Sequence, residues 1–107
     1  MDLQELNEET VDILKYIQNI KFSVLYFTAS WCGPCKKVYP NLCKINNEVN
    51  KIEIFKVDID KNEEISNKFN IKSVPTFILF KNGNIVNQCN GSNINQLGQM
   101  IIKEISK

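Results

Sequence analysis

Histidine and arginine are both absent from this chain of 107 residues. Without histidine there is no Ser-His or Cys-His nucleophile and no histidine-ligated metal site. Haem attachment through a Cys-x-x-Cys-His motif is also excluded, because Lys36 follows Cys35. Without arginine, no side chain offers the bidentate fork that recognises phosphate or guanine.

The chain also lacks a charge excess of either sign and any long hydrophobic run. Its 13 lysines are balanced by 12 aspartates and glutamates, for a net charge of +1. This balance argues against a nucleic-acid or membrane-surface partner. The acidic N-terminus has no apolar run, and no segment is long enough to span a membrane, so we expect no signal peptide. The expected location is cytoplasmic, with an organelle as the alternative if a leader has been removed.

The apolar pattern predicts one domain over residues 1–107, without repeats or linkers. A helix is expected to open at residues 7–9, with Leu6, Val11, Leu14 and Ile17 as its apolar stripe, and to end near residue 19. The dipeptide Asn82-Gly83 predicts a hairpin, and Asn93 predicts a helix cap. The further predicted elements are strands at 22–28, 52–60, 76–81 and 84–88, helices at 32–49, 62–69 and from 93 on, and a weak strand within 2–6. This order predicts an α/β fold, with a mixed sheet of four or five strands between two helix layers.

Two cysteines three residues apart, Cys32 and Cys35, lie where a predicted buried strand gives way to a helix. Backbone N–H groups and the helix dipole at that point favour a thiolate, the form of cysteine that attacks disulfides. A redox pair is therefore the leading interpretation. The alternatives are a structural disulfide or half of a zinc site, although Cys43 and Cys89 do not form a second Cys-x-x-Cys.

Four segments together resemble the thioredoxin family over essentially the whole chain. Residues 31–36 read Trp-Cys-Gly-Pro-Cys-Lys, and residues 73–77 read Ser-Val-Pro-Thr-Phe. Residues 80–83 and 90–92 are similar to the hairpin and the glycine loop of that family. The resemblance implies a thioredoxin fold and a protein-disulfide reductase.

The resemblance also implies roles for individual residues. Cys32 would attack a substrate disulfide, and Cys35 would resolve the mixed disulfide, closing a Cys32–Cys35 disulfide. No cofactor is implied beyond this dithiol, since electrons would come from thioredoxin reductase or another dithiol donor. The partners would be disulfide-containing proteins, and we expect a monomer. Gly33 and Pro34 would shape the turn, and Trp31 would cover the site. Val74 would offer backbone groups to an extended substrate, and Gly91 would leave room for that substrate. Pro75 would be preceded by a cis peptide bond.

One position departs from the family pattern. The family usually has a buried aspartate six residues before the first cysteine, and this chain has Tyr26 there. A tyrosine, with a pKa of about 10 that burial raises further, is a poor base near neutral pH. Lys56, which the family can pair with that acid, is expected to lose its partner. We hypothesise slower or more pH-dependent turnover than in a typical member.

Other polar residues near the predicted site have less specific interpretations. Cys43 lies beside the apolar stripe of its helix, so we expect partial exposure, with a regulatory thiol or a dimer disulfide as the alternative role. Cys89 is interpreted as a small packing residue. Asp58 or Asp60 is expected to accept a hydrogen bond from the Trp31 indole; the alternative is a solvated turn acid.

Three functions are compatible with these residues. The leading one is a general protein-disulfide reductase. An oxidase or isomerase is the second, but that class tends to carry a histidine between its cysteines and a secretory leader. The third is a thioredoxin-fold adaptor or binding subunit with an idle or regulatory dithiol, which the tyrosine at position 26 keeps open.

Overall fold

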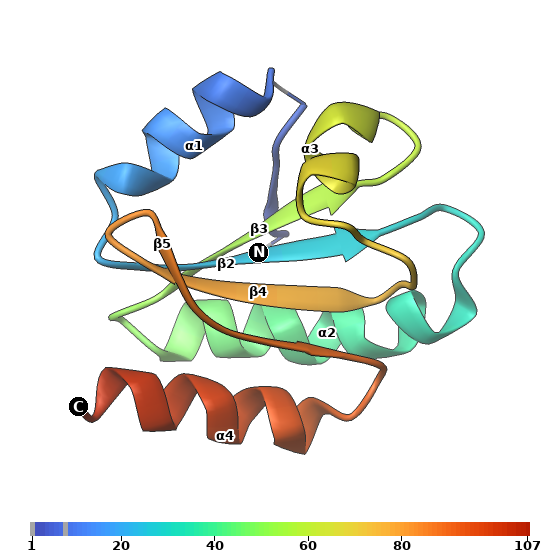
Figure 1. Cartoon of the computed structure of the whole chain (residues 1–107). Helices are drawn as coiled ribbons and strands as arrows, with labels where there is room; N and C mark the ends of the chain where they lie inside the picture. The colour runs from blue at the N-terminus through green and yellow to red at the C-terminus, as the bar shows by residue number, and fades with distance from the viewer. Residues whose placement is uncertain (1, 8) are drawn as a thin grey trace.

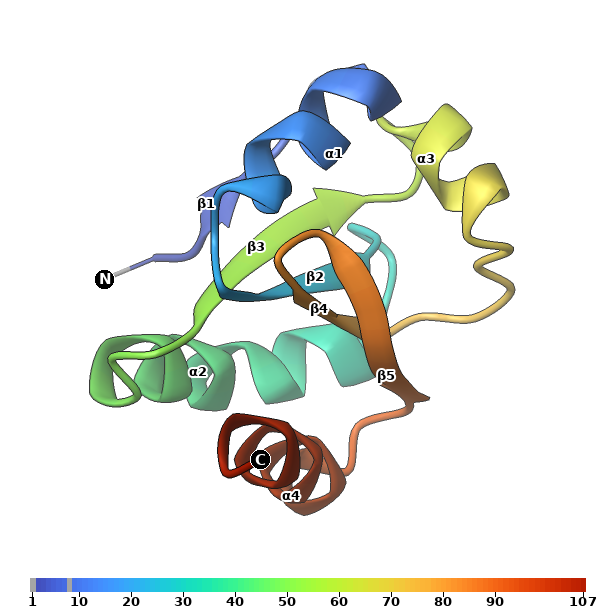
Figure 2. The same cartoon turned by 60° about the vertical axis from the view of Figure 1, so that its left-hand side comes forward.

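A computed structural model describes residues 2–7 and 9–107 as a five-stranded sheet between two layers of helices (Figure 1). Helices α1 and α3 cover one face of the sheet, and α2 and α4 cover the other (Figures 1 and 2). The predicted mixed sheet is confirmed, and the weak strand makes it five-stranded. The strands are β1 (Gln4–Glu5), β2 (Phe22–Thr28), β3 (Glu53–Asp58), β4 (Thr76–Lys81) and β5 (Asn84–Asn90); the helices are α1 (Thr10–Gln18), α2 (Gly33–Glu48), α3 (Glu63–Lys68) and α4 (Ile94–Ile105).

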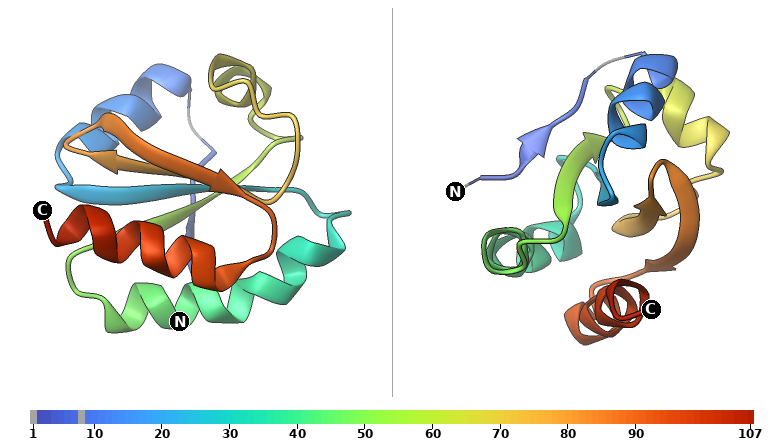
Figure 3. Two further views of the ribbon diagram at one scale, coloured as in Figure 1. Left: turned by 60° about the horizontal axis from the view of Figure 1, so that its bottom comes forward. Right: turned by 90° about the vertical axis from the view of Figure 1, so that its left-hand side faces the viewer.

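The sheet is built around β2, all seven residues of which are buried. The strand order is β1-β3-β2-β4-β5, with β1 and β5 at the two edges (Figure 3). The strands β1, β3 and β2 run parallel, whereas β4 and β5 are antiparallel to their neighbours. A strand covered on both faces must be apolar nearly throughout, which explains why residues 22–28 show no alternation.

Each face of the sheet has its own hydrophobic core. On the face covered by α2 and α4, Leu42 and Leu97 are fully buried against β2 and β4. On the opposite face, Ile13 of α1 packs among buried side chains that include Phe27 and Phe55. Burying an aliphatic or aromatic side chain of this size contributes roughly 1.5–3 kcal/mol. The helices therefore hold to the sheet by their apolar faces.

The start of α1 corrects the sequence prediction. The helix begins at Thr10, with Glu9 as its N-cap, and not at residues 7–9. A tertiary contact explains the shift, because the Glu64 side chain of α3 accepts the backbone N–H of Thr10 at 3.2 Å. Asn7 instead accepts a hydrogen bond from Asn62 at 3.3 Å. Glu8, also predicted in the first turn, lies outside the described residues.

The apolar stripe of α1 was also partly wrong. Val11 is 55% exposed, while Ile13 and Ile17 are fully buried. The buried residues of α1 are Thr10, Ile13 and Ile17, whose spacing of three and four forms a stripe that excludes Val11. No helix among the described residues is both long and apolar enough to cross a membrane.

The hairpin and the cap of the last helix are confirmed, whereas the side chain at the start of α3 does not cap that helix. Asn82 and Gly83 have φ angles of 52° and 85°, as a two-residue hairpin between β4 and β5 requires. The Asn93 side chain accepts the backbone N–H of Gln96 at 3.2 Å and caps α4. Asn62 occupies the N-cap position of α3, but its side chain makes no capping bond and donates to the Asp58 carbonyl oxygen at 3.0 Å.

Substitution by alanine should have opposite effects on stability at two of the glycines. A Cβ at Gly98 of α4 would meet nothing within 4 Å, so Gly98→Ala should raise the free energy of unfolding by about 0.5–1 kcal/mol through helix propensity. A Cβ at Gly83 would lie 2.7 Å from Gln18 Cγ, at a φ of +85°. Gly83→Ala should therefore lower stability by more than about 1 kcal/mol. Urea unfolding midpoints of the oxidised protein measure both changes, and a stability loss in Gly98→Ala would contradict this account of α4.

Candidate active site

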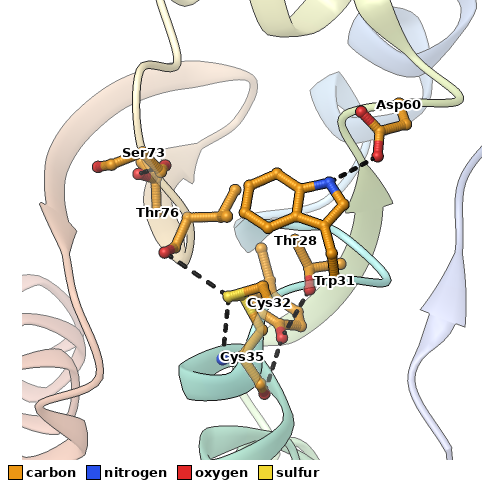
Figure 4. The surroundings of a disulfide bond; sticks show 9 residues. Thr28, Trp31, Cys32, Cys35, Asp60, Ser73 and Thr76 are labelled. Atoms are coloured by element: carbon orange, nitrogen blue, oxygen red, sulfur yellow. Dashed lines mark hydrogen bonds between the residues drawn. A yellow bond between two sulfur atoms is a disulfide. The ribbon is translucent and has the colours of Figure 1, made fainter.

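The two cysteines occupy the junction between β2 and α2. After β2 ends, the Cys32 N–H donates to the Ala29 carbonyl oxygen at 3.1 Å, and Cys32 becomes the N-cap of α2. Gly33 and Pro34 are the first two helical residues, where a proline costs no intrahelical hydrogen bond. A disulfide joins Cys32 to Cys35, whose Cα atoms are 5.3 Å apart (Figure 4).

The two sulfur atoms differ in their hydrogen bonding and not in their exposure. Cys32 is 3% exposed and Cys35 is 2% exposed, so burial does not separate them. The Cys32 sulfur accepts the backbone N–H of Cys35 at 3.2 Å, at the positive end of the helix dipole. Both features stabilise a negative charge on Cys32 once the disulfide is reduced.

Trp31 lies over the dithiol on the protein surface (Figure 4). Its side chain is 67% exposed, and its indole N–H donates to Asp60 Oδ2 at 3.0 Å. Asp58 is the buried partner in this turn, and its carboxylate accepts the Asp60 N–H at 2.9 Å. Of the two aspartates expected to accept the indole N–H, Asp60 is the acceptor, and Asp58 holds Asp60 in place.

A loop before β4 faces the dithiol and gathers the predicted substrate-binding residues. The Val74–Pro75 peptide bond is cis, and the Val74 carbonyl oxygen lies 3.7 Å from the Cys32 sulfur. The Gly91 N–H donates to the Pro75 carbonyl oxygen at 2.9 Å, which joins the glycine loop to this loop. Gly91 has a φ of +88°, and a Cβ there would meet nothing within 4 Å. The space beside Gly91 is thus open.

Tyr26 fills the position beneath Cys35. The residue is 1% exposed, and its ring stacks on Phe77 with centroids 5.4 Å apart. Its hydroxyl lies 3.1 Å from both the Cys35 carbonyl oxygen and Thr28 Oγ1. The carbonyl can only accept, so Tyr26 donates to it and the Thr28 hydroxyl is free to donate to Tyr26. Burial raises the pKa of Tyr26, so the side chain stays uncharged at neutral pH.

Lys56 has no acid at position 26 to pair with, but it has another partner that the sequence did not indicate. Its ammonium lies 3.9 Å from Glu5 Oε1, and Lys61 lies 3.7 Å from Glu5 Oε2. Sequence reasoning missed Glu5, because only the pairing of β1 with β3 brings it beside Lys56. A pocket of about 440 Å³ lies below the dithiol, and its lining includes Glu5, Tyr26, Cys35 and Lys56.

The other two cysteines are free thiols outside the site. Cys43 is partly buried, as expected, and Cys89 is partly buried against the core under α2 and α4. Burial raises the pKa of the Cys89 thiol, which fits a packing residue. Across residues 2–7 and 9–107, no group of three or more potential ligand side chains could hold a metal ion.

A disulfide pair at a helix N-terminus, faced by an exposed tryptophan and a cis-proline loop, supplies the groups that thiol–disulfide exchange requires. The Thioredoxin family model matches residues 4–103 of this chain. The chain belongs to the thioredoxin family.

Individual relatives agree with this assignment. The chain is 34% identical to Thioredoxin-T of Drosophila melanogaster over 91% of its own length, and spans 62% of that relative. It is 40% identical to Thioredoxin 1 of Plasmodium falciparum over 75% of this chain and 77% of that one. A solved Plasmodium falciparum thioredoxin structure superposes with a TM-score of 0.88 at 33% identity, covering 94% of this chain and 98% of that one.

The asymmetry between the sulfurs predicts which thiol reacts first. In the reduced protein near neutral pH, iodoacetamide should alkylate Cys32 at least about tenfold faster than the other cysteines, because only Cys32 receives a backbone N–H at a helix N-terminus. Peptide mass mapping after short exposure measures the order. Earlier labelling of Cys35 or Cys89 would contradict the assignment.

Proposed function

We propose that the protein is a general protein-disulfide reductase in which Cys32 is the nucleophile and Cys35 the resolving thiol. The observation that carries this proposal is the hydrogen bond from the Cys35 N–H to the Cys32 sulfur at the N-cap of α2. A thiolate formed at Cys32 is stabilised before any substrate binds. The same hydrogen bond holds Cys35 next to the Cys32 sulfur, which the Cys35 thiolate must attack.

The reaction proceeds in two exchange steps. The Cys32 thiolate attacks one sulfur of a substrate disulfide, forms a mixed disulfide and releases the other substrate sulfur as a thiolate. Cys35, after losing its proton, attacks the Cys32 sulfur, closes the Cys32–Cys35 disulfide and releases the second substrate thiolate. The substrate gains two electrons and the protein loses two. Thioredoxin reductase or another dithiol donor then reduces the protein again, and no further cofactor takes part.

The substrate segment binds in an extended form between Trp31 and the loop that contains Val74 and Pro75. Backbone groups of Val74 lie beside the reacting sulfur, where an added strand can form hydrogen bonds. The open space at Gly91 admits side chains of that strand. We further propose that the protein acts as a monomer in the cytoplasm, where it contributes to electron transport and redox homeostasis and has no nucleic-acid or membrane partner.

Cys35→Ser should lower the turnover rate for insulin disulfides by at least about a hundredfold, because the mixed disulfide is not resolved. The variant should also accumulate covalent complexes with substrates, visible as bands that a reductant removes. Cys43→Ser and Cys89→Ser are matched controls and should keep the wild-type rate. An adaptor with an idle dithiol would show no insulin reduction in the wild type and would bind the same partners in both redox states.

The tyrosine beneath Cys35 should make turnover depend on pH. Because burial raises the Tyr26 pKa, this side chain accepts no proton between about pH 6 and pH 9, and the rate should fall toward pH 6. Tyr26→Asp should raise the insulin-reduction rate in the lower part of this range. Tyr26→Phe, which keeps the ring against Phe77, should follow the wild-type profile. Equal rates for wild type and Tyr26→Asp across the range would sink the hypothesis.

A further inference from the structure

The charged groups near Cys35 lie beside it and not directly beneath it. Cys35 must give up its proton before it attacks, and the group directly beneath it, Tyr26, is neutral. The pocket under Cys35 is nevertheless lined by charged side chains.

The strand register places one carboxylate in line with the tyrosine beneath Cys35. Tyr26 of β2 is the cross-strand partner of Lys56 of β3, and Lys56 is in turn the partner of Glu5 of β1. Directly paired residues point to the same face of a sheet, so these three side chains form one row on the face covered by α2. Lys56 stands in the middle of this row, between the neutral Tyr26 and the carboxylate of Glu5.

Glu5 is held in this row by two ammonium groups. Lys56 lies 3.9 Å and Lys61 lies 3.7 Å from its two carboxylate oxygens. The Glu5 side chain is 30% exposed, so these pairs are partly wet and add little to stability. Their effect is to place one negative charge at the rim of the pocket and to offset nearby positive charge.

We propose that Glu5 tunes the resolving step: its carboxylate, at the rim of the pocket, raises the pH at which the Cys35 thiol gives up its proton. Glu5 is a positioning residue in this role, since it acts through the electrostatic potential of the pocket and touches neither the substrate nor the sulfurs. The inference rests on the proposed role of Cys35 as the resolving thiol.

The remaining charged and titratable groups around the pocket define the potential that Glu5 modifies. They are Tyr26 of β2, Lys36 and Tyr39 of α2, Lys56 and Asp58 of β3, and Lys61 after β3. Three lysines face two carboxylates, so the lining carries a net positive charge with Glu5 present, and a larger one without it. Asp58 is the other carboxylate, but it is buried and accepts the Asp60 N–H at 2.9 Å. Lys56 makes its ion pair with Glu5.

The experiment follows the resolving step alone. In a Cys43→Ser, Cys89→Ser background, Cys32 is loaded with thionitrobenzoate as a mixed disulfide at acid pH, and the protein is then jumped to a series of pH values. Attack by Cys35 releases the coloured thiolate, and the rate gives a midpoint against pH. Removing a negative charge favours a thiolate, so Glu5→Gln should lower the midpoint by about 0.3–1 pH unit. Lys56→Met should raise it by a similar amount.

Two controls separate this role from a structural one. Glu53→Gln makes the same charge change on the same strand as Lys56, but outside the pocket lining, and should leave the midpoint unchanged. About 1 M salt should shrink the shift in Glu5→Gln, because the carboxylate is partly exposed. A structural role would change the plateau rate without moving the midpoint in opposite directions for the glutamate and the lysine.

The outcomes are distinguishable. If the unmodified background releases no dye, Cys35 is not the resolving thiol and the proposed function fails. If dye is released but the midpoint of Glu5→Gln stays at the wild-type value, or moves upward, the role of Glu5 is overturned and the proposed function stands. A shift in Asp58→Asn without one in Glu5→Gln would assign the charge to Asp58 and overturn the proposal equally.

Discussion

The buried central strand β2 is the constraint on which the site depends. Every side chain from Phe22 to Thr28 is buried, and the strand is hydrogen-bonded to β3 on one side and to β4 on the other. Such a strand is held at both edges and on both faces, and this fixes the position at which it ends. The chain turns there and begins α2, and this sets Cys32 at a helix N-terminus next to the start of β4. The reactivity of the dithiol thus follows from the packing of the strand that precedes it.

The same strand carries the departure that distinguishes this chain. A tyrosine at position 26 brings an aromatic ring into the core, where it stacks on Phe77, and a hydroxyl that donates to the first turn of α2. An acid at this position would supply charge beneath Cys35, whereas the tyrosine supplies a hydrogen bond and apolar contact. The side chain beneath Cys35 therefore serves packing and hydrogen bonding, and the charged side chains lie around it in the pocket lining.

Much of this could be predicted from local patterns, and the failures have a common physical cause. The buried strand, the Asn82-Gly83 hairpin and the Asn93 cap are confirmed because each depends on a few adjacent residues. The start of α1 was wrong because a side chain from α3, Glu64, satisfies the first N–H group of the helix. The partner that Lys56 has in the structure, Glu5, was missed for a similar reason, since it lies 51 positions earlier in the sequence and only the pairing of β1 with β3 brings it close.

The sequence by itself determined the chemistry of this protein: a Cys-Gly-Pro-Cys pair between a buried strand and a helix, a facing Val-Pro-Thr loop, and a tyrosine where the family has an acid. These features are local, because turn geometry, helix caps and thiol chemistry depend on neighbours along the chain. Tertiary structure alone decided that Asp60 accepts the Trp31 indole, that Gly91 joins the loop at Pro75, and that Glu5 stands in one row with Lys56 and Tyr26. Each of these contacts joins segments distant in the chain, and only the pairing and packing of the strands sets their distance.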